Sequence, residues 1–112
     1  MGMEIVGRAA FAAEMALDGE TVATLYGYFA EELADDMAEM DAAAARRDGD
    51  AFTRLVHKMK GTSASYHADV LHACLADADR YCKAGELEAA FGLAAELRAS
   101  AEAALREISG WS

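Results

Sequence analysis

The fold is decided by the stretch "ETVATLYGYFAEELADDMAEMDAAAAR", residues 20–46. Acidic side chains fill much of one side of this segment, and Arg46 and Arg47 stand at its end, where a helix dipole is negative. Apolar side chains recur at spacings of three and four residues, the pattern of one buried helix face: Val22, Leu25, Tyr26, Phe29, Leu33, Met37, Met40 and Ala44. The stretch therefore predicts one long amphipathic helix that packs against other helices.

Shorter segments on both sides repeat the pattern. We expect five helices, over residues 4–16, 20–46, 49–65, 68–83 and 86–108. Asp18 and either Asp48 or Asp50 suit N-terminal caps, and Gly85 suits a C-terminal stop. The chain has no proline, and connections of about two to five residues predict antiparallel neighbours. The predicted fold is all-α, a single domain over residues 1–112: an antiparallel four-helix bundle with a short extra N-terminal helix capping one end.

Composition excludes several classes of protein. The formal net charge of −10 argues against a nucleic-acid binder, which needs a basic surface, and against docking on anionic lipid. No run of apolar residues approaches the roughly 20 that a membrane-spanning helix needs. The N-terminal residues lack the layout of a signal peptide, so we expect a cytoplasmic protein.

A titratable side chain stands in the third helix, in "LVHKMKGTSASYH", residues 55–67. His57 falls on the flank of the apolar stripe, and Lys60, Gly61 and Ala64 share its face. A neutral imidazole is a good nucleophile near neutral pH, and an ammonium one turn away offsets the charge of an attached phosphoryl group. The spacing thus suits phosphoryl chemistry on nitrogen, but taken alone it favours a surface histidine beside two solvated lysines.

A longer stretch, "AFTRLVHKMKGTSASYHADVLHACLADADRYCKAGELEAA", resembles the core of the histidine-containing phosphotransfer (HPt) domain family. The family motif is matched at His57, Lys60, Gly61, Thr62 and Ser63, with Met59 in place of the usual leucine. The resemblance covers roughly residues 4–108. One departure is His67, where the family usually has a glycine that suits a helix-ending turn; histidine tolerates such a turn at a cost.

The resemblance implies a carrier in a two-component phosphorelay. His57 would accept a phosphoryl group from an aspartyl phosphate on a response-regulator receiver domain, free or in a hybrid sensor histidine kinase, and pass it to another receiver. Lys60 would be the charge partner, and Gly61 would permit close approach. The receiver would supply the aspartate and Mg²⁺, so the chain is expected to need no cofactor of its own and not to be an enzyme.

The surface around His57 is where a receiver would dock. We expect Arg54, Lys58 and Lys60 to form a local basic spot on the acidic protein, with Lys58 either solvated or in contact with the receiver. The other expected docking residues are Gly61 and Ala64 beside the histidine and exposed apolar side chains from the first two helices: Phe11, Met15, Leu17 and, less directly, Tyr28.

Other titratable residues point to no separate site. The three histidines are ten and five residues apart, so no helix face brings them together as metal ligands. Cys74 and Cys82 are separated by about 12 Å along a helix, too far for a disulfide, and we interpret them as buried thiols. The prediction is a monomeric phosphocarrier; the alternatives are a degenerate HPt-like module that docks without phosphotransfer, and a plain helical scaffold.

Overall fold

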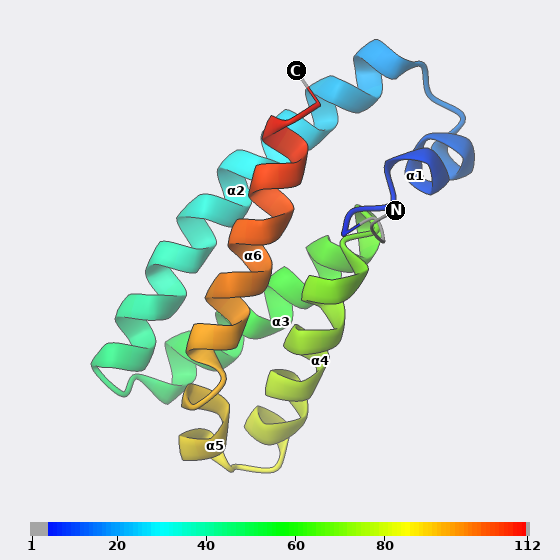
Figure 1. The fold of residues 1–112 in the computed structure, drawn as a ribbon. Coiled ribbons are helices and arrows are strands. Elements are labelled where there is room, and N and C mark those ends of the chain that lie inside the picture. Colours follow the sequence, from blue (N-terminus) through cyan, green and yellow to red (C-terminus); the bar gives the residue numbers. More distant parts are fainter. Residues whose placement is uncertain (1–4, 112) are drawn as a thin grey trace.

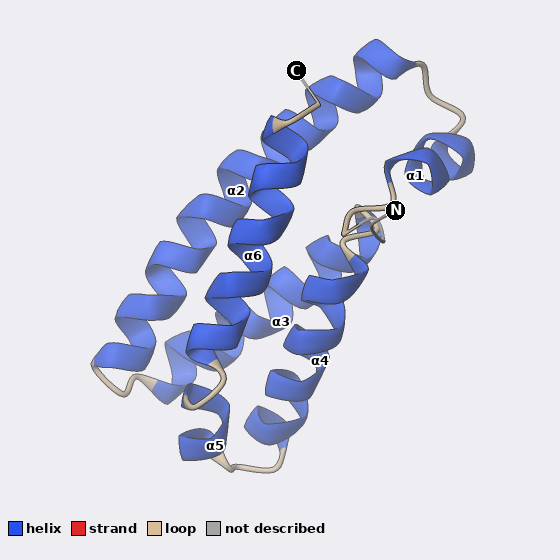
Figure 2. Cartoon of the chain, in the orientation of Figure 1, coloured by secondary structure: helices blue, strands red, loops and turns tan. Residues whose placement is uncertain are grey.

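The computed structural model describes residues 5–111, and this range is folded into six helices without a strand (Figures 1 and 2). They are α1 (Arg8–Met15), α2 (Gly19–Ala45), α3 (Gly49–Ser65), α4 (Asp69–Lys83), α5 (Leu87–Phe91) and α6 (Ala94–Ser109). The predicted all-α class is confirmed.

The four long helices form the bundle (Figure 1). The first of them, α2, packs against α3 and α6, and α4 packs against the same two helices from the other side. The chain reverses between α2 and α3, between α3 and α4, and through α5 between α4 and α6, so successive long helices are antiparallel (Figure 1). The single-turn α5 packs against α4, and α1 packs against the start of α2. The predicted antiparallel bundle with a short N-terminal helix is confirmed.

The core is built from the stripes that the sequence pattern predicts. Most of the largest fully buried side chains come from α2, α3, α4 and α6 and meet in the middle of the bundle, among them Tyr26, Met40, Phe52, Val56, Met59, Leu71, Leu75 and Leu97. Asp18 and Asp48 cap α2 and α3 by accepting hydrogen bonds from the backbone N–H groups of Thr21 (2.7 Å) and Ala51 (3.1 Å).

Aromatic side chains close the end of the bundle where α1 lies. The rings of Phe11 and Phe29 both stack on Tyr66, at centroid distances of 5.1 and 4.6 Å. The Tyr26 hydroxyl donates to the Tyr66 carbonyl at 2.6 Å, and burial raises the pKa of Tyr26 to about 12. The Trp111 ring lies edge-on to Tyr26 at 5.0 Å, so the C-terminal residues fold back onto the bundle. This cluster fixes α1 to the turn between α3 and α4.

Two helix boundaries differ from the prediction. The first helix begins at Arg8, because the Glu107 carboxylate accepts hydrogen bonds from the N–H groups of Ile5 (3.2 Å) and Val6 (2.6 Å) and holds them outside a helix. Glu4, the first residue of the predicted segment, lies outside the described residues. The helix expected over 86–108 is broken after Phe91, since Gly92 disfavours a helix interior and Leu93 closes a tight turn onto Ala90.

Within residues 5–111, every helix is too short or too polar to cross a membrane.

Candidate functional site

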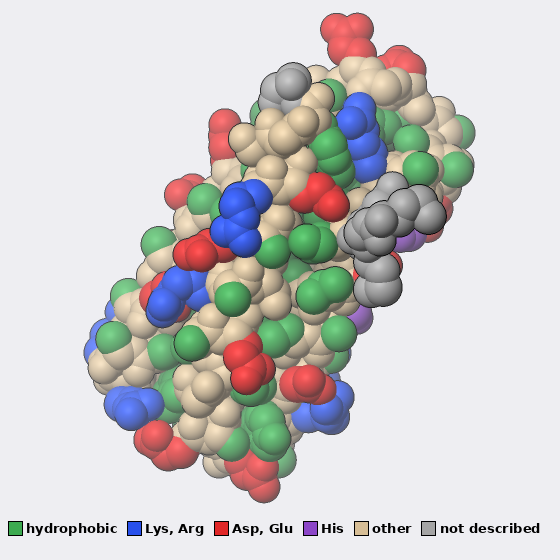
Figure 3. All heavy atoms as spheres, in the orientation of Figure 1, with side chains coloured by type: hydrophobic (Ala, Val, Ile, Leu, Met, Phe, Trp, Pro, Cys, Tyr) green, Lys and Arg blue, Asp and Glu red, His purple; other side chains and the backbone are tan. Residues whose placement is uncertain are grey.

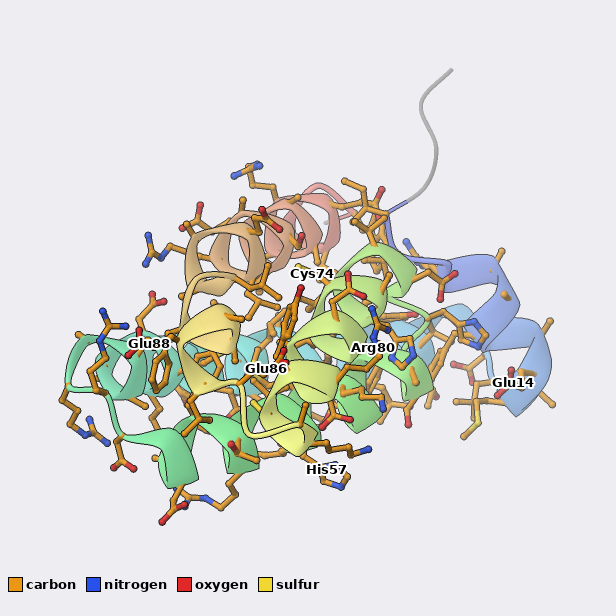
Figure 4. The ribbon with its side chains drawn as sticks, turned by 90° about the horizontal axis from the view of Figure 1, so that it is seen from below. Glu14, His57, Cys74, Arg80, Glu86 and Glu88 are labelled. Carbon is orange, nitrogen blue, oxygen red and sulfur yellow. The ribbon has the colours of Figure 1, made fainter. Side chains whose placement is uncertain are left out.

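His57 lies on the exposed side of α3. The buried stripe of this helix, which includes Val56 and Met59, faces the core and thereby turns position 57 outward. Figure 4 shows the ring outside the bundle, pointing away from the helices, and the residue is exposed. The imidazole therefore stands in water on a rigid helix, where another protein can reach it.

A strip of small residues continues from His57 toward the α1 end of the bundle. Gly61, Ala64 and Ser65 follow His57 on the exposed side of α3 and span about 12 Å with it. We call these four residues the α3 strip. A Cβ at position 61 would meet no atom within 4 Å beyond its own helix backbone. Packing therefore does not require a glycine there, and its absent side chain leaves bare backbone one turn from the imidazole.

Lys60, the predicted charge partner, is joined to a buried carboxylate. Its Nζ lies 3.1 Å from Oδ2 of Asp79 on α4, and the Nζ of Lys83 lies 2.9 Å from the same oxygen. Asp79 is only 2% exposed. The hydrogen bond from Lys83, followed by that from Lys60, lowers the pKa of the Asp79 carboxyl despite its burial. Because helix side chains lean toward the N-terminus, Lys60 leans over the turn that holds His57.

Lys58 forms a second ion pair on the other side of His57. Its Nζ lies 3.0 Å from Oδ1 of Asp36, which is buried on α2, and this hydrogen bond raises the pKa of Lys58. Lys58 is therefore paired within the bundle rather than simply solvated. Since Lys58 and Lys60 are both balanced by buried carboxylates, the local basic spot is weaker than expected, with Arg54 exposed beside it.

Charges elsewhere on the surface are mixed. On the side seen in Figure 3, lysine and arginine side chains are interspersed with acidic and apolar ones. No single sign of charge dominates this face.

The turn after α3 forms although His67 replaces the glycine of the family pattern. His67 has φ of 56°, in the left-handed region, and the N–H groups of His67 and Ala68 close back onto Ala64 (3.2 Å) and Ser63 (2.9 Å). The His67 carbonyl accepts from Gly7 N–H at 2.9 Å, and its Nε2 lies 3.0 Å from the Glu14 carboxylate. The helix ends at Ser65 as predicted, so the substitution does not lengthen α3.

The remaining histidine has a structural contact. His72 is half-buried at the start of α4, with Nδ1 3.0 Å from the Lys60 carbonyl oxygen. Because a carbonyl only accepts hydrogen bonds, Nδ1 carries the proton and links α4 to α3. No group of three or more His, Cys, Asp or Glu side chains among residues 5–111 is placed to hold a metal ion.

The expected apolar docking residues are divided between the core and the surface. Phe11 is only 4% exposed, so the expectation that it is exposed is wrong: its ring stacks on Tyr66. Met15 and Tyr28 are 51% and 64% exposed, whereas Leu17 is half-buried. A shallow groove between α1, α2 and the end of α3 lies beside the α3 strip; it is lined by Phe11, Glu14, Met15, Leu25, Ser65 and Tyr66.

The two cysteines lie at the edge of the core. Cys74 and Cys82 are free thiols and half-buried, so the prediction of buried thiols is correct only in part. Burial raises the pKa of Cys74, which keeps it in the less reactive thiol form.

The sequence reasoning missed three charged residues of the site: Asp36, Asp79 and Lys83. One signal for Asp79 was present, because it falls on the buried stripe of α4 between Leu75 and Cys82, where an apolar residue is expected. Its spacing of four residues from Lys83 also predicts an ion pair on one helix face. The partners across helices, Lys58 with Asp36 and Lys60 with Asp79, require the tertiary structure.

The described residues thus form an all-α bundle that presents an accessible histidine from the middle of one helix. The sequence profile of the Hpt domain family matches residues 24–107, which include α3 with His57 and the bundle helices around it. The chain belongs to the Hpt domain family. Neither a curated protein nor a solved structure matches it. Membership assigns the chain a phosphotransfer role in two-component signalling, together with receiver domains or kinases.

Proposed function

We propose that this Hpt domain is a phosphorelay carrier: His57 accepts a phosphoryl group from the aspartyl phosphate of a receiver domain and passes it to another receiver. The observation that carries the proposal is the exposure of the His57 ring (Figure 4) beside the bare backbone of Gly61, with Lys60 three residues along the same helix. A histidine that served only packing would not need to face water next to an empty position.

The transfer balances without any further reactant. A lone pair of the neutral imidazole forms the N–P bond while the P–O bond to the aspartate breaks, and the electron pair leaves with the carboxylate. The other ring nitrogen keeps its proton. The reverse reaction, on a second receiver, returns the neutral imidazole. In this proposal the receiver contributes the aspartate and Mg²⁺, while the Hpt chain contributes the nucleophile and the surface that positions it.

The α3 strip and the groove beside it form the proposed docking surface. Gly61, Ala64 and Ser65 have short or absent side chains, so a receiver can approach the helix backbone closely next to His57. Met15 offers an exposed apolar contact at the far end, where α1 meets α3. Small residues near the reacting atom and an apolar anchor farther away suit a transient, specific complex.

The test is transfer of labelled phosphate from phosphorylated receivers to the wild-type chain and to His57→Gln. We expect label on the wild type that is labile in acid and stable in alkali, as for phosphohistidine, and none on the variant. Label that persists on His57→Gln would contradict the assignment. Receivers that bind without transferring label would instead establish the docking-module alternative.

A further inference from the structure

Asp79 accepts hydrogen bonds from two ammonium groups through one carboxylate oxygen, an arrangement that the proposed carrier role does not by itself explain. Lys60 approaches it from α3 and Lys83 from α4, at 3.1 and 2.9 Å. Asp79 is buried, whereas the side chain of Lys83 is 64% exposed and that of Lys60 is 31% exposed. One ammonium is enough to balance one carboxylate, so the second is available for another charge.

That other charge arises when His57 is phosphorylated. A phosphoryl group on a side chain adds negative charge and three strong acceptor oxygens. Lys60 lies three residues from His57 and leans over its turn, so its flexible side chain can reach the phosphoryl oxygens. However, a buried carboxylate that loses its partner is strongly unfavourable, and Lys60 can leave Asp79 only if another cation stays.

We propose that Lys83 is a positioning residue that holds Asp79 neutralised while Lys60 turns from Asp79 to the phosphoryl group on His57. Lys83 does not touch the reacting atoms; it acts through Asp79 and Lys60. The inference rests on the proposed function of His57. This role explains why the buried Asp79 has two partners from different helices: the exposed Lys83 of α4, and Lys60 of α3, which is close to His57 in the sequence.

The inference predicts how phosphorylation depends on Lys83. In Lys83→Met, Lys60 must remain with Asp79, and the phosphoryl group loses its charge partner. We expect the equilibrium constant for transfer from a phosphorylated receiver to His57 to fall about tenfold, the size of one charge-assisted hydrogen bond. Lys83→Arg keeps a cation at the same place and should lie within about twofold of the wild type.

A double-variant cycle separates this role from general charge or stability effects. Asp79→Asn removes the buried charge, so Lys60 is free in every state; adding Lys83→Met to it should change the transfer equilibrium by less than about twofold. Arg80→Met is the matched control, because Arg80 (labelled in Figure 4) is an exposed cation on the same helix. It pairs with Asp77 instead of Asp79. This variant should behave as the wild type.

The outcomes are distinct. If Lys83→Met transfers like Arg80→Met, or if its deficit persists in the Asp79→Asn background, the inference is refuted while the carrier role stands. If the wild-type chain takes no label from any receiver, the carrier role itself fails. Urea denaturation of each variant checks that the compared proteins are folded. The replaced cations, Lys83 and Arg80, are on the surface, so their removal should leave the fold intact.

Discussion

Replacing Gly61 with alanine separates the requirements of the fold from those of docking. Gly61 lies inside α3 with helical neighbours on both sides, and a Cβ there would meet nothing within 4 Å outside its own helix backbone. Alanine is favoured over glycine in a helix interior by about 0.5 to 1 kcal/mol. With no clash to offset this gain, Gly61→Ala should increase the free energy of unfolding by that amount.

The effect on phosphotransfer should have the opposite sign. The added methyl group would stand on the α3 strip one turn from His57, where the proposed docking brings a receiver close to the backbone. Overpacking at a close-fitting contact costs about 1 to 3 kcal/mol. A loss of about 1.4 kcal/mol in the transition state lowers the transfer rate constant about tenfold. The variant should therefore be more stable and less active.

The chain contains its own control. Gly27 also lies inside a helix, and a Cβ added to it would likewise meet nothing within 4 Å, but it is on α2 and faces Trp111 and the end of α6. Gly27→Ala should gain similar stability and keep wild-type transfer. The assays are urea denaturation and the second-order rate constant for transfer from a phosphorylated receiver. Equal transfer rates for the two variants would refute the idea that Gly61 serves access to His57.

Three further predictions concern stability. Ser63 is fully buried, and its Oγ has no hydrogen-bond partner among the described residues. Because a buried hydroxyl without a partner loses hydration for nothing, Ser63→Ala should raise the free energy of unfolding in urea by about 1 kcal/mol. A lower free energy of unfolding would show that the hydroxyl is hydrogen-bonded. Ala16 has φ of 54°, a left-handed conformation that costs an L-residue about 1 to 2 kcal/mol. Ala16→Gly relieves this strain by more than the extra entropy of the unfolded glycine chain costs, so the thermal midpoint should rise. An unchanged or lower midpoint would argue against the strain. The pKa of Asp79 is lower in the folded than in the unfolded chain, so the stability that its ionised carboxylate contributes is complete above the ordinary pKa of 3.8 and is lost as the pH falls below it. The free energy of unfolding, measured over a pH series, should therefore fall less steeply in acid for Asp79→Asn than for the wild type. Identical slopes would contradict the ion pairing.

Helix periodicity predicts most of this fold because each long helix buries a continuous stripe. The segment expected over 49–65 coincides with α3, since Asp48 caps its start and its apolar positions keep their spacing to the end. The same wheel correctly places His57 on the exposed flank. Local signals suffice here because the side chains that define the helix also define which way it faces.

The features that the sequence did not predict depend on distant contacts. Ile5 and Val6 fit the helical spacing of the first segment, but the Glu107 carboxylate from α6 binds their N–H groups. The short first helix suggests an exposed Phe11, yet the stacking of its ring on Tyr66 buries it. In each case the partner is far away in the chain, and no local spacing indicates it.

The two ion pairs that flank His57 are better explained by function than by stability. Burying a carboxylate and an ammonium together often gains nothing over a well-packed apolar pair, because both groups lose hydration. Yet Asp36 and Asp79 are buried on opposite neighbours of α3, and each holds a lysine from the turn around the histidine. The pairs fix the rotation of α3 against α2 and α4, so the imidazole faces outward. They also neutralise the two lysines of the His57 turn without creating a strongly basic surface. Under the proposed carrier role, Lys60, whose place at Asp79 can be taken by Lys83, would be the lysine that follows the phosphoryl group.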